Sequence, residues 1–397
     1  MTPNSRDIDV LVFGATGLTG RRVARRLAAE AKDDLRIGLC GRSPTKLELL
    51  GVELANTELV VADATDPISL LKAVRRAHVV ASCAGPFSRL GTAVVDACVR
   101  SGTHYADITG ETVWARSILE RYDASAKEAG VALVPFCGFD SIPADLGVLR
   151  LVRSARERFD EGIGDVFGVY RLRGGLNGGS LASILEIAGS TSPKQLADPF
   201  LLVPEVDAPP EMIEHHADPR ATITEPGSGQ TLVPFFMGPI NRRVVMRSDY
   251  LLRYGSGLRY REYLSAGSLD PRLGTLLAWG QGMALRLLGT RLGRAAAERF
   301  GPSPGEGPSR QAIESGSCRL DLFAETESGR ELQLRFEVDG DPGNRVTSLC
   351  LAQSALALRA GEHAGQAGVL TPAAALGERL LARLERTGEW RSRWVKE

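Results

Sequence analysis

A glycine-rich turn near the start of the chain has the residue types and spacing to hold a pyrophosphate. The segment GATGLTG follows an apolar run and opens a helical pattern. Gly14 permits a tight turn, Gly17 lets the backbone approach phosphate oxygens, and Gly20 lets the helix pack closely on the strand. The first helical turn then offers unpaired N–H groups and partial positive charge to phosphates. We expect the following residues to bind a dinucleotide: Gly14, Thr16, Gly17, Leu18, Thr19 and Gly20.

The end of the second predicted strand indicates which dinucleotide is bound. An NAD enzyme usually places an acidic residue there, on the ribose 2′-hydroxyl. In this chain Gly41 is followed by Arg42 and Ser43, which suit a 2′-phosphate through charge-assisted hydrogen bonds. The alternative is a solvated surface arginine without a ligand. We predict that the cofactor is NADP(H).

Two further segments at strand ends are expected to line the same cleft, because ligands of open parallel sheets bind outside the carboxyl ends of the strands. Asp63, after the third strand, is expected to meet the adenine edge. The segment after the fourth strand is expected beside the ribose and nicotinamide, with a packing role as the alternative for its phenylalanine. Its residues are Ala84, Gly85, Pro86 and Phe87.

Two polar loops, HYADITGE and GFDSIPAD, follow the fifth and sixth predicted strands. Both are expected to face the nicotinamide, where substrate reacts. We predict that Tyr105, Ser141 or Asp140 donates a proton or a hydrogen bond to the substrate, and that Gly138 and Phe139 contact it. The alternative for the acids in these loops is that they cap the helices that follow.

Several kinds of chemistry are disfavoured by the composition. Equal numbers of basic and acidic residues, 48 of each, give no general attraction to nucleic acid. No Tyr-x-x-x-Lys pair occurs where the short-chain dehydrogenase mechanism would need one, since Tyr122 is followed four residues later by Ala126. The five histidines lack metal-ligand spacing, and the six cysteines form no CxxC motif. We therefore expect no metal site and reduced thiols in a cytoplasmic protein without a signal peptide.

The elements that must position these residues form a repeating strand–helix pattern over the first 150 residues. Six short apolar strands with intervening helices predict a doubly wound parallel sheet covered on both faces, with strand order 3-2-1-4-5-6. The predicted strands are 8–13, 36–40, 58–62, 78–83, 104–108 and 131–136.

The rhythm changes after Phe139, and a second domain is expected. The predicted fold class is α/β: a Rossmann domain of residues 1–150 plus about 346–397, and an α+β substrate and dimerisation domain of about 151–345. Strands of a mainly antiparallel sheet are expected at 166–172, 243–254, 319–326 and 330–338, and helices at 179–188, 272–300, 347–359 and 372–386. The apolar stretch 273–289 contains Gln281 and Arg286 and is too polar to span a membrane, so we interpret it as a buried or interfacial helix.

The order of these motifs resembles that of the saccharopine dehydrogenase-like oxidoreductases, and most closely their trans-acting enoyl reductases. The motifs are GATGLTG, CGRS, AGPF, HYADITGE and GFDSIPAD, in that order. GGLNGGS at 174–180 and GVLTP at 368–372 also match, so the resemblance covers nearly the whole chain. Saccharopine reductases themselves carry a GLDPGIDH-like loop in place of GFDSIPAD, which argues against saccharopine as substrate.

The resemblance implies NADPH-dependent reduction of an unsaturated acyl thioester held by an acyl carrier protein or polyketide synthase. It also implies that Gly178 and Gly179 lie at the substrate, and that the last helices return to the Rossmann half. We further expect a homodimer.

Two other interpretations stay open. One is reduction of an imine or carbonyl in a small amino or keto acid, with Arg171 and Arg173 as cations for its carboxylates. The other is a non-enzymatic module that docks on lipid or on a partner through residues 273–292, where arginines accompany leucines, as in a peripheral membrane helix.

Overall fold

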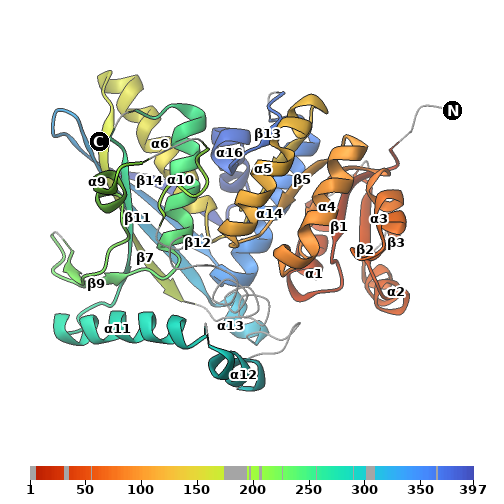
Figure 1. Ribbon diagram of the computed structural model, residues 1–397, viewed down its shortest axis with the longest axis horizontal. Helices are drawn as coiled ribbons and strands as arrows, with labels where there is room; N and C mark the ends of the chain where they lie inside the picture. Colours follow the sequence, from red (N-terminus) through yellow and green to blue (C-terminus); the bar gives the residue numbers. More distant parts are fainter. Residues whose placement is uncertain are drawn as a thin grey trace. The chain divides into compact units, whose positions relative to one another are not determined.

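The computed structural model describes residues 6–30, 35–54, 56–173, 195, 198–204, 208–225, 227–255, 257–288, 290–300, 309–363 and 365–397. The chain divides into two compact units. Within the described residues, the first unit comprises the chain up to Ile142 together with Gly343–Thr387, and the second comprises most of the remainder, including Gly388–Glu397. Figure 1 gives the elements of both.

The first unit is built on a parallel seven-stranded sheet in the order β13-β6-β5-β4-β1-β2-β3 (Figure 1). The predicted Rossmann order is confirmed, and β13 extends the sheet beside β6. Every residue of β1 and β2 is buried, which fits central parallel strands covered on both faces. The strands are β1 (Ile8–Phe13), β2 (Ile37–Gly41), β3 (Thr57–Val61), β4 (Ala77–Ser82), β5 (His104–Asp107), β6 (Ala132–Val134) and β13 (Gly368–Val369).

The helices of the first unit include three from the C-terminal part of the chain. Helix α14 packs beside α1, where Gln353 donates to Glu30 at 2.7 Å and Arg359 donates to Asp9 at 2.7 Å. Ser43 and Asp66 accept from main-chain N–H groups as the N-caps of α2 and α3, each with proline at the first helical position. The helices are α1 (Leu18–Glu30), α2 (Pro44–Glu53), α3 (Pro67–Val74), α4 (Phe87–Ser101), α5 (Thr112–Glu128), α14 (Thr347–Arg359), α15 (Pro372–Ala375) and α16 (Gly377–Arg386), with a π-helical turn at Pro342–Val346 before α14.

The second unit is built on a seven-stranded mixed sheet in the order β14-β12-β11-β7-β10-β9-β8. All its neighbours are antiparallel except β7 and β10, which run parallel. Residues alternate strictly between the two faces of β12, and Leu332, Leu334, Phe336 and Val338 point to the buried face. The strands are β7 (Ile163–Arg173), β8 (Ile223–Thr224), β9 (Thr231–Pro234), β10 (Arg259–Ser265), β11 (Ser317–Thr326), β12 (Glu331–Asp339) and β14 (Trp390–Lys396).

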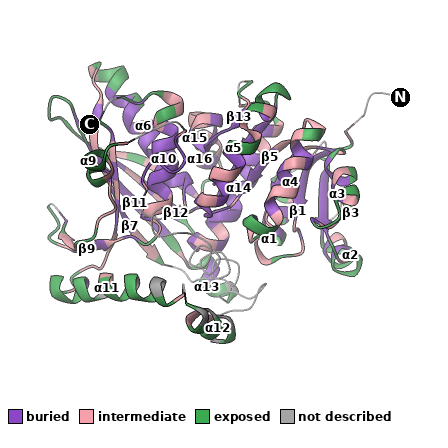
Figure 2. Ribbon diagram, viewed as in Figure 1, coloured by how far each residue is buried: buried purple, intermediate pink, exposed green. Residues whose placement is uncertain are grey.

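Helices α6 and α10 bury one face of this sheet (Figure 2). Gly147 of α6 lets the helix approach so closely that an added Cβ would lie 2.1 Å from Leu322 of β11. Ser248 of α10 donates a hydrogen bond to the buried carboxylate of Asp145. The helices are α6 (Ile142–Phe159), α9 (Pro210–His215), α10 (Gly238–Leu252), α11 (Pro271–Leu288), α12 (Arg291–Phe300) and α13 (Arg310–Glu314).

Three predicted elements of the second unit differ in the structure. Residues 243–254, expected as a strand, lie mostly in helix α10, because buried Arg242 and Arg243 donate to main-chain carbonyls and let the helix be covered on all sides. The helix expected at 272–300 is divided into α11 and α12. The C-terminal residues expected with the Rossmann domain continue into β14, which pairs with β12 in the second sheet. The helix expected at 179–188 lies outside the described residues.

A buried carboxyl group sits between the sheet of the second unit and α10. Glu262 of β10 accepts from Asn241 at 2.8 Å and from Tyr260 at 2.6 Å, with Tyr170 at 3.3 Å. Burial raises the pKa of Glu262 to about 7 in spite of these donors. The folded chain therefore holds a proton there that an unfolded chain releases.

This proton gives the first prediction. Since the pKa of Glu262 is raised above its ordinary value of 4.5, the folded state loses stability as pH rises from about 4.5 to about 7, by on the order of 3 kcal/mol. Glu262→Gln keeps the shape but carries no titrating proton, so its melting temperature should fall less between pH 5 and pH 8. Thermal unfolding followed by circular dichroism measures this. Exposed Glu157→Gln is the matched control, and an equal fall in wild type and Glu262→Gln would refute the assignment.

Candidate functional site

The glycine turn between β1 and α1 has the geometry of a phosphate cradle. Gly14 adopts φ +79°, and its N–H donates to Cys40 at 3.0 Å, which ties the turn to the end of β2. An added Cβ on Gly20 would lie 2.1 Å from the Gly14 carbonyl oxygen, so only glycine lets α1 start so close to the turn. Gly17 is exposed. The backbone is thus open to a pyrophosphate at the positive end of a helix, which fits a dinucleotide.

The end of β2 lies beside this turn. An added Cβ on Gly41 would meet Thr16 at 3.5 Å, so the next residue, Arg42, stands at the rim of the cradle. Arg42 is exposed, and it forms no hydrogen bond or ion pair with any residue that the structure describes. Ser43 accepts from Lys46 N–H at 3.4 Å as the N-cap of α2. An exposed arginine and a helix N-terminus therefore lie together at the end of β2, and their contact with a 2′-phosphate stays a prediction.

Asp63 follows β3, and its carboxylate is hydrogen-bonded to a residue of its own turn. Its carboxylate accepts from the N–H and the hydroxyl of Thr65, both at 2.9 Å, and these bonds hold the pKa of Asp63 below its ordinary value. Asp63 thus shapes its own turn, and its predicted contact with the adenine stays a prediction.

The loop after β4 is fixed by a carboxylate from the loop after β5. An added Cβ on Gly14 would meet Ala84 at 3.1 Å, so this loop forms the other wall of the cradle. Buried Glu111 accepts from Phe87 N–H at 2.8 Å and from Ser88 N–H at 2.9 Å. The Phe87 ring is itself buried against Trp114, with centroids 5.6 Å apart. Phe87 is thus a packing residue, and Gly85 and Pro86 remain the part of the loop near the cleft.

Glu111 is one end of a chain of buried hydrogen bonds. Its own N–H donates to the Thr109 hydroxyl at 3.0 Å, and Thr109 N–H donates to Asp107 at 2.9 Å. Asp107 also accepts from Phe136 N–H, 3.2 Å away in the loop after β6. Loops at the ends of β4, β5 and β6 are therefore tied together by two carboxylates. Burial raises the pKa of Asp107 to about 7.

Tyr105, predicted as a donor to the substrate, is buried and occupied in the structure. Its hydroxyl donates to Asp107 at 2.8 Å, and burial raises its pKa well above the ordinary value. The structure therefore gives Tyr105 the task of holding Asp107. The prediction that Tyr105 donates to the substrate is therefore corrected, because its ring lies in the core, beneath the sheet edge, and its hydroxyl is bonded to Asp107.

Asp140 differs from the other acids of these loops. No hydrogen bond to its carboxyl group occurs among the described residues, so the alternative that it caps α6 is not supported. Burial alone raises the pKa of Asp140 to about 6. Neighbouring Phe139 is held by its N–H, which donates to Thr347 at 3.2 Å, while Gly138 accepts from Ile142 N–H at 3.1 Å. Ser141 is fully buried.

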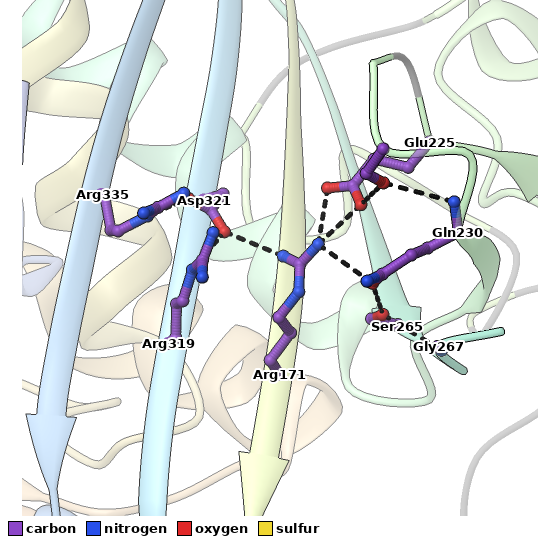
Figure 3. A network of polar contacts seen from close by, with 9 residues as sticks. Arg171, Glu225, Gln230, Ser265, Gly267, Arg319, Asp321 and Arg335 are labelled. Atoms are coloured by element: carbon purple, nitrogen blue, oxygen red, sulfur yellow. Dashed lines mark hydrogen bonds and ion pairs between the residues drawn. The ribbon is translucent and has the colours of Figure 1, made fainter. Parts of the chain in front are cut away.

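The arginines considered for substrate carboxylates lie on β7 in the second unit (Figure 3). Arg171 pairs with Glu225 at 2.6 Å and with Asp321 at 2.8 Å. Asp321 is buried, and it also accepts from Arg319 and Arg335. Arg171 is thus neutralised by two carboxylates, which makes it a poor anchor for an amino or keto acid.

The remaining predictions about site residues have simple outcomes. Gly178 and Gly179 lie outside the described residues. In the part of the chain that the structure describes, no cluster of His, Cys, Asp or Glu could hold a metal ion. The cysteines are all free, and Cys83, at the end of β4, is the one that is not fully buried.

Comparisons with known proteins agree with this geometry. Residues 10–134 match the family model described as the saccharopine dehydrogenase NADP-binding domain. A protein of Mycobacterium tuberculosis named a putative trans-acting enoyl reductase is 38% identical over 417 residues, covering 98% of each chain. The chain belongs to the saccharopine dehydrogenase-like oxidoreductases. It is an NADP-binding enzyme of that family.

Other relatives extend the comparison over the full length. A trans-acting enoyl reductase of Mycobacterium ulcerans is 34% identical, again over 98% of each chain. The fold is that of the apo saccharopine dehydrogenase (L-Glu forming) of Saccharomyces cerevisiae, with a TM-score of 0.57, 12% identity and coverage of 98% of this chain and 100% of that one. The family assignment thus rests on the sequence, and the distant structure supports the architecture.

Sequence reasoning missed Glu111, which no local pattern marks. Its partners are 23 and 24 residues away and reach it only because β4 and β5 are neighbours in the sheet. Glu111 is the last residue of the HYADITGE motif. Its position after Thr109 and Gly110 is the one signal that could have suggested hydrogen bonds to another loop.

Arg42 provides a test of cofactor choice. If its guanidinium binds the 2′-phosphate, Arg42→Ala should weaken NADPH binding by about 10- to 100-fold, the range of one charge-assisted hydrogen-bonded pair. NADH binding should not change, because NADH lacks that phosphate. Calorimetric titration of both cofactors measures this, with Arg100→Ala in α4 as the exposed control. Equal NADPH affinity in wild type and Arg42→Ala would contradict the assignment.

Glu111 provides a test of the loop connection. The amide of Glu111→Gln accepts through one oxygen only, so one of the two N–H groups loses its partner, at a cost of about 1–3 kcal/mol. We expect a lower melting temperature and weaker NADPH binding together, because the same loop walls the cradle. Glu120→Gln, an exposed position on α5, is the control. A destabilised variant that binds NADPH as wild type does would show that Glu111 is structural without affecting the cofactor.

Proposed function

We propose that this enzyme reduces the carbon–carbon double bond of an α,β-unsaturated acyl thioester. The observation that carries the proposal is Asp140, a carboxyl group without hydrogen bonds among the described residues and with a pKa raised to about 6. The names of the full-length relatives, trans-acting enoyl reductases, supply the substrate class.

The reaction needs a proton as well as a hydride. When bound, NADPH supplies the hydride, which forms a bond to the β-carbon of the substrate. The electron pair of the double bond moves toward the thioester oxygen, and the resulting enolate must be protonated at the α-carbon. An acid whose pKa lies near the working pH is suited to that step.

Asp140 is our candidate for the proton donor. A carboxyl group with pKa near 6 keeps a protonated fraction at neutral pH, where an ordinary aspartate has almost none. It lies in the loop after β6, at the carboxyl edge of the sheet where ligands of such folds bind. The carboxylate left after transfer regains its proton from water.

Developing negative charge on the thioester oxygen requires hydrogen-bond donors. We propose the Ser141 hydroxyl and, carried over from the sequence, the main chain at Gly178 and Gly179. Tyr105 is not included, because its hydroxyl serves Asp107. Tyr105 instead holds Asp107, whose carboxyl group connects the loops after β5 and β6.

The acyl chain is proposed to arrive on an acyl carrier protein or polyketide synthase, because the relatives are named for action in trans. The alternative substrate, a small amino or keto acid, is weakened by the pairing of Arg171 with Glu225 and Asp321. A homodimer stays a prediction.

The proposal predicts oxidation of NADPH, followed at 340 nm in the usual assay, when a short enoyl thioester is added. Asp140→Asn should lower kcat by about 100-fold or more, the range of one general acid, and leave the NADPH dissociation constant unchanged. Because Asp140 acts when protonated, wild-type kcat should fall as pH rises above about 6. Asp160→Asn, at an exposed position after α6, is the matched control.

Two results would count against this function. Turnover of keto or imino acids in place of enoyl thioesters would replace the substrate class. Full activity of Asp140→Asn on an enoyl thioester would keep the substrate and remove Asp140 as the acid.

A further inference from the structure

Helix α11 exposes a row of large apolar side chains that the fold and the proposed reaction do not use. The exposed residues are Leu273, Leu276, Trp279, Met283 and Leu287. Leu276 is 66% exposed and Trp279 is 73% exposed, so these are not side chains at the margin of the core. Figure 2 shows most of α11 as exposed.

The row is a single stripe on one face of the helix. At 100° per residue, its five positions fall within about 120° of the helix circumference. The start of the helix packs on the sheet of the second unit, beside β9. Gly274 is buried there, and an added Cβ would lie 2.7 Å from Thr231 of β9. The helix is therefore anchored near Gly274 and presents its large apolar residues outward.

Monomeric proteins rarely leave a contiguous stripe of this kind in water, and such patches mark binding surfaces. The sequence expectation of a buried helix is corrected by these exposures. Of the two interpretations of 273–289 made from the sequence, the interfacial one fits. The following helix, α12, adds Leu292, which is 85% exposed.

Charge identifies the kind of surface that this stripe fits. The whole chain is neutral, with 48 basic and 48 acidic residues, but residues 271–300 contain five arginines and one glutamate. The described arginines at the two ends of this segment, Arg272 and Arg299, are exposed. Apolar side chains accompanied by an excess of arginine are the pattern of a helix lying on an anionic lipid surface.

A second copy of the chain fits less well. A twofold interface places the same patch against itself, so the excess positive charge of one segment would face that of the other. Insertion across a bilayer is also disfavoured, since in the part of the chain that the structure describes no helix is long and apolar enough to span one.

We propose that α11 binds the surface of anionic membranes, with its apolar stripe inserted at the level of the headgroups. Trp279, the most exposed residue of the stripe, enters the interface, where tryptophan is favoured. The arginines of 271–300 contact lipid phosphates. This binding is separate from the reaction proposed above, and neither depends on the other.

The test is flotation of the full chain with vesicles of phosphatidylglycerol and phosphatidylcholine, and with vesicles of phosphatidylcholine alone. Wild type should float with the anionic vesicles and lose binding at high salt. The double variant Leu276→Ser, Trp279→Ser should bind at least about tenfold more weakly, because it removes two exposed apolar side chains. The control is Val52→Ser with Ile68→Ser, two exposed apolar residues of α2 and α3.

Two further measurements make the test decisive. Quenching of Trp279 fluorescence by brominated lipid, absent in Trp279→Phe, would show that this side chain enters the membrane. NADPH binding and thermal unfolding of the double variant should match wild type, since these residues contact solvent.

Failure of wild type to float, or equal flotation of the double variant, would overturn the proposal. So would sedimentation of wild type as a dimer that the double variant converts to a monomer, without vesicle binding, because the stripe would then be an interface between copies.

Discussion

Two carboxylates that water does not reach, Asp107 and Glu111, set the shape of the cofactor half. A buried carboxylate must receive hydrogen bonds, because leaving it without partners costs several kcal/mol. Here the donors are main-chain N–H groups at Phe87, Ser88, Thr109 and Phe136, together with the Tyr105 hydroxyl. These donors come from β5 and from the loops after β4, β5 and β6, so none of the three loops can move without breaking a bond in the shared chain. The three loops are thereby fixed to one another by the chain itself.

The same rule explains the polar groups of the second unit. Asp321 is buried but is held by three arginines, and Glu262 by an amide and two tyrosines. Burial raises the pKa of Glu262 to about 7, because its neutral hydrogen-bond donors do not offset the loss of water. At Asp321 the buried negative charge is balanced by arginines, whereas at Glu262 the raised pKa favours the neutral form.

The first sheet could be predicted from the sequence because its signals are local. Apolar runs, the glycine turn and helix caps recur in order, and right-handed crossovers then allow few strand orders. Helix α10 could not be predicted in this way, because the sequence of Arg242, Arg243, Val244 and Val245 is typical of a strand with one exposed face. Only their donation to carbonyls of distant loops makes arginine a core residue there. Strand β10 was missed for a similar reason, because its polar residues are satisfied by other strands and helices.

The sequence predicts candidate cofactor residues but not the connections between loops. The predicted roles of Gly14, Gly20 and Arg42 depend on their own backbone or charge, so residue type and position are enough to propose them. The role of Tyr105 depends on where Asp107 lies, and that of Glu111 on a loop 23 residues earlier. Such roles follow from the sheet order, which is a property of the whole chain.

Features left without partners are informative in a chain where most polar groups are paired. Among the described residues, the Asp140 carboxyl receives no hydrogen bond, the Arg42 guanidinium forms no hydrogen bond or close ion pair, and α11 exposes a stripe of large apolar side chains. We propose a different kind of partner for each: a substrate carbon to protonate for Asp140, a phosphate for Arg42 and a lipid surface for α11. The three positions use different chemistry and lie on different elements. None of the three contributes to the packing of the core, so we attribute each to a proposed binding partner.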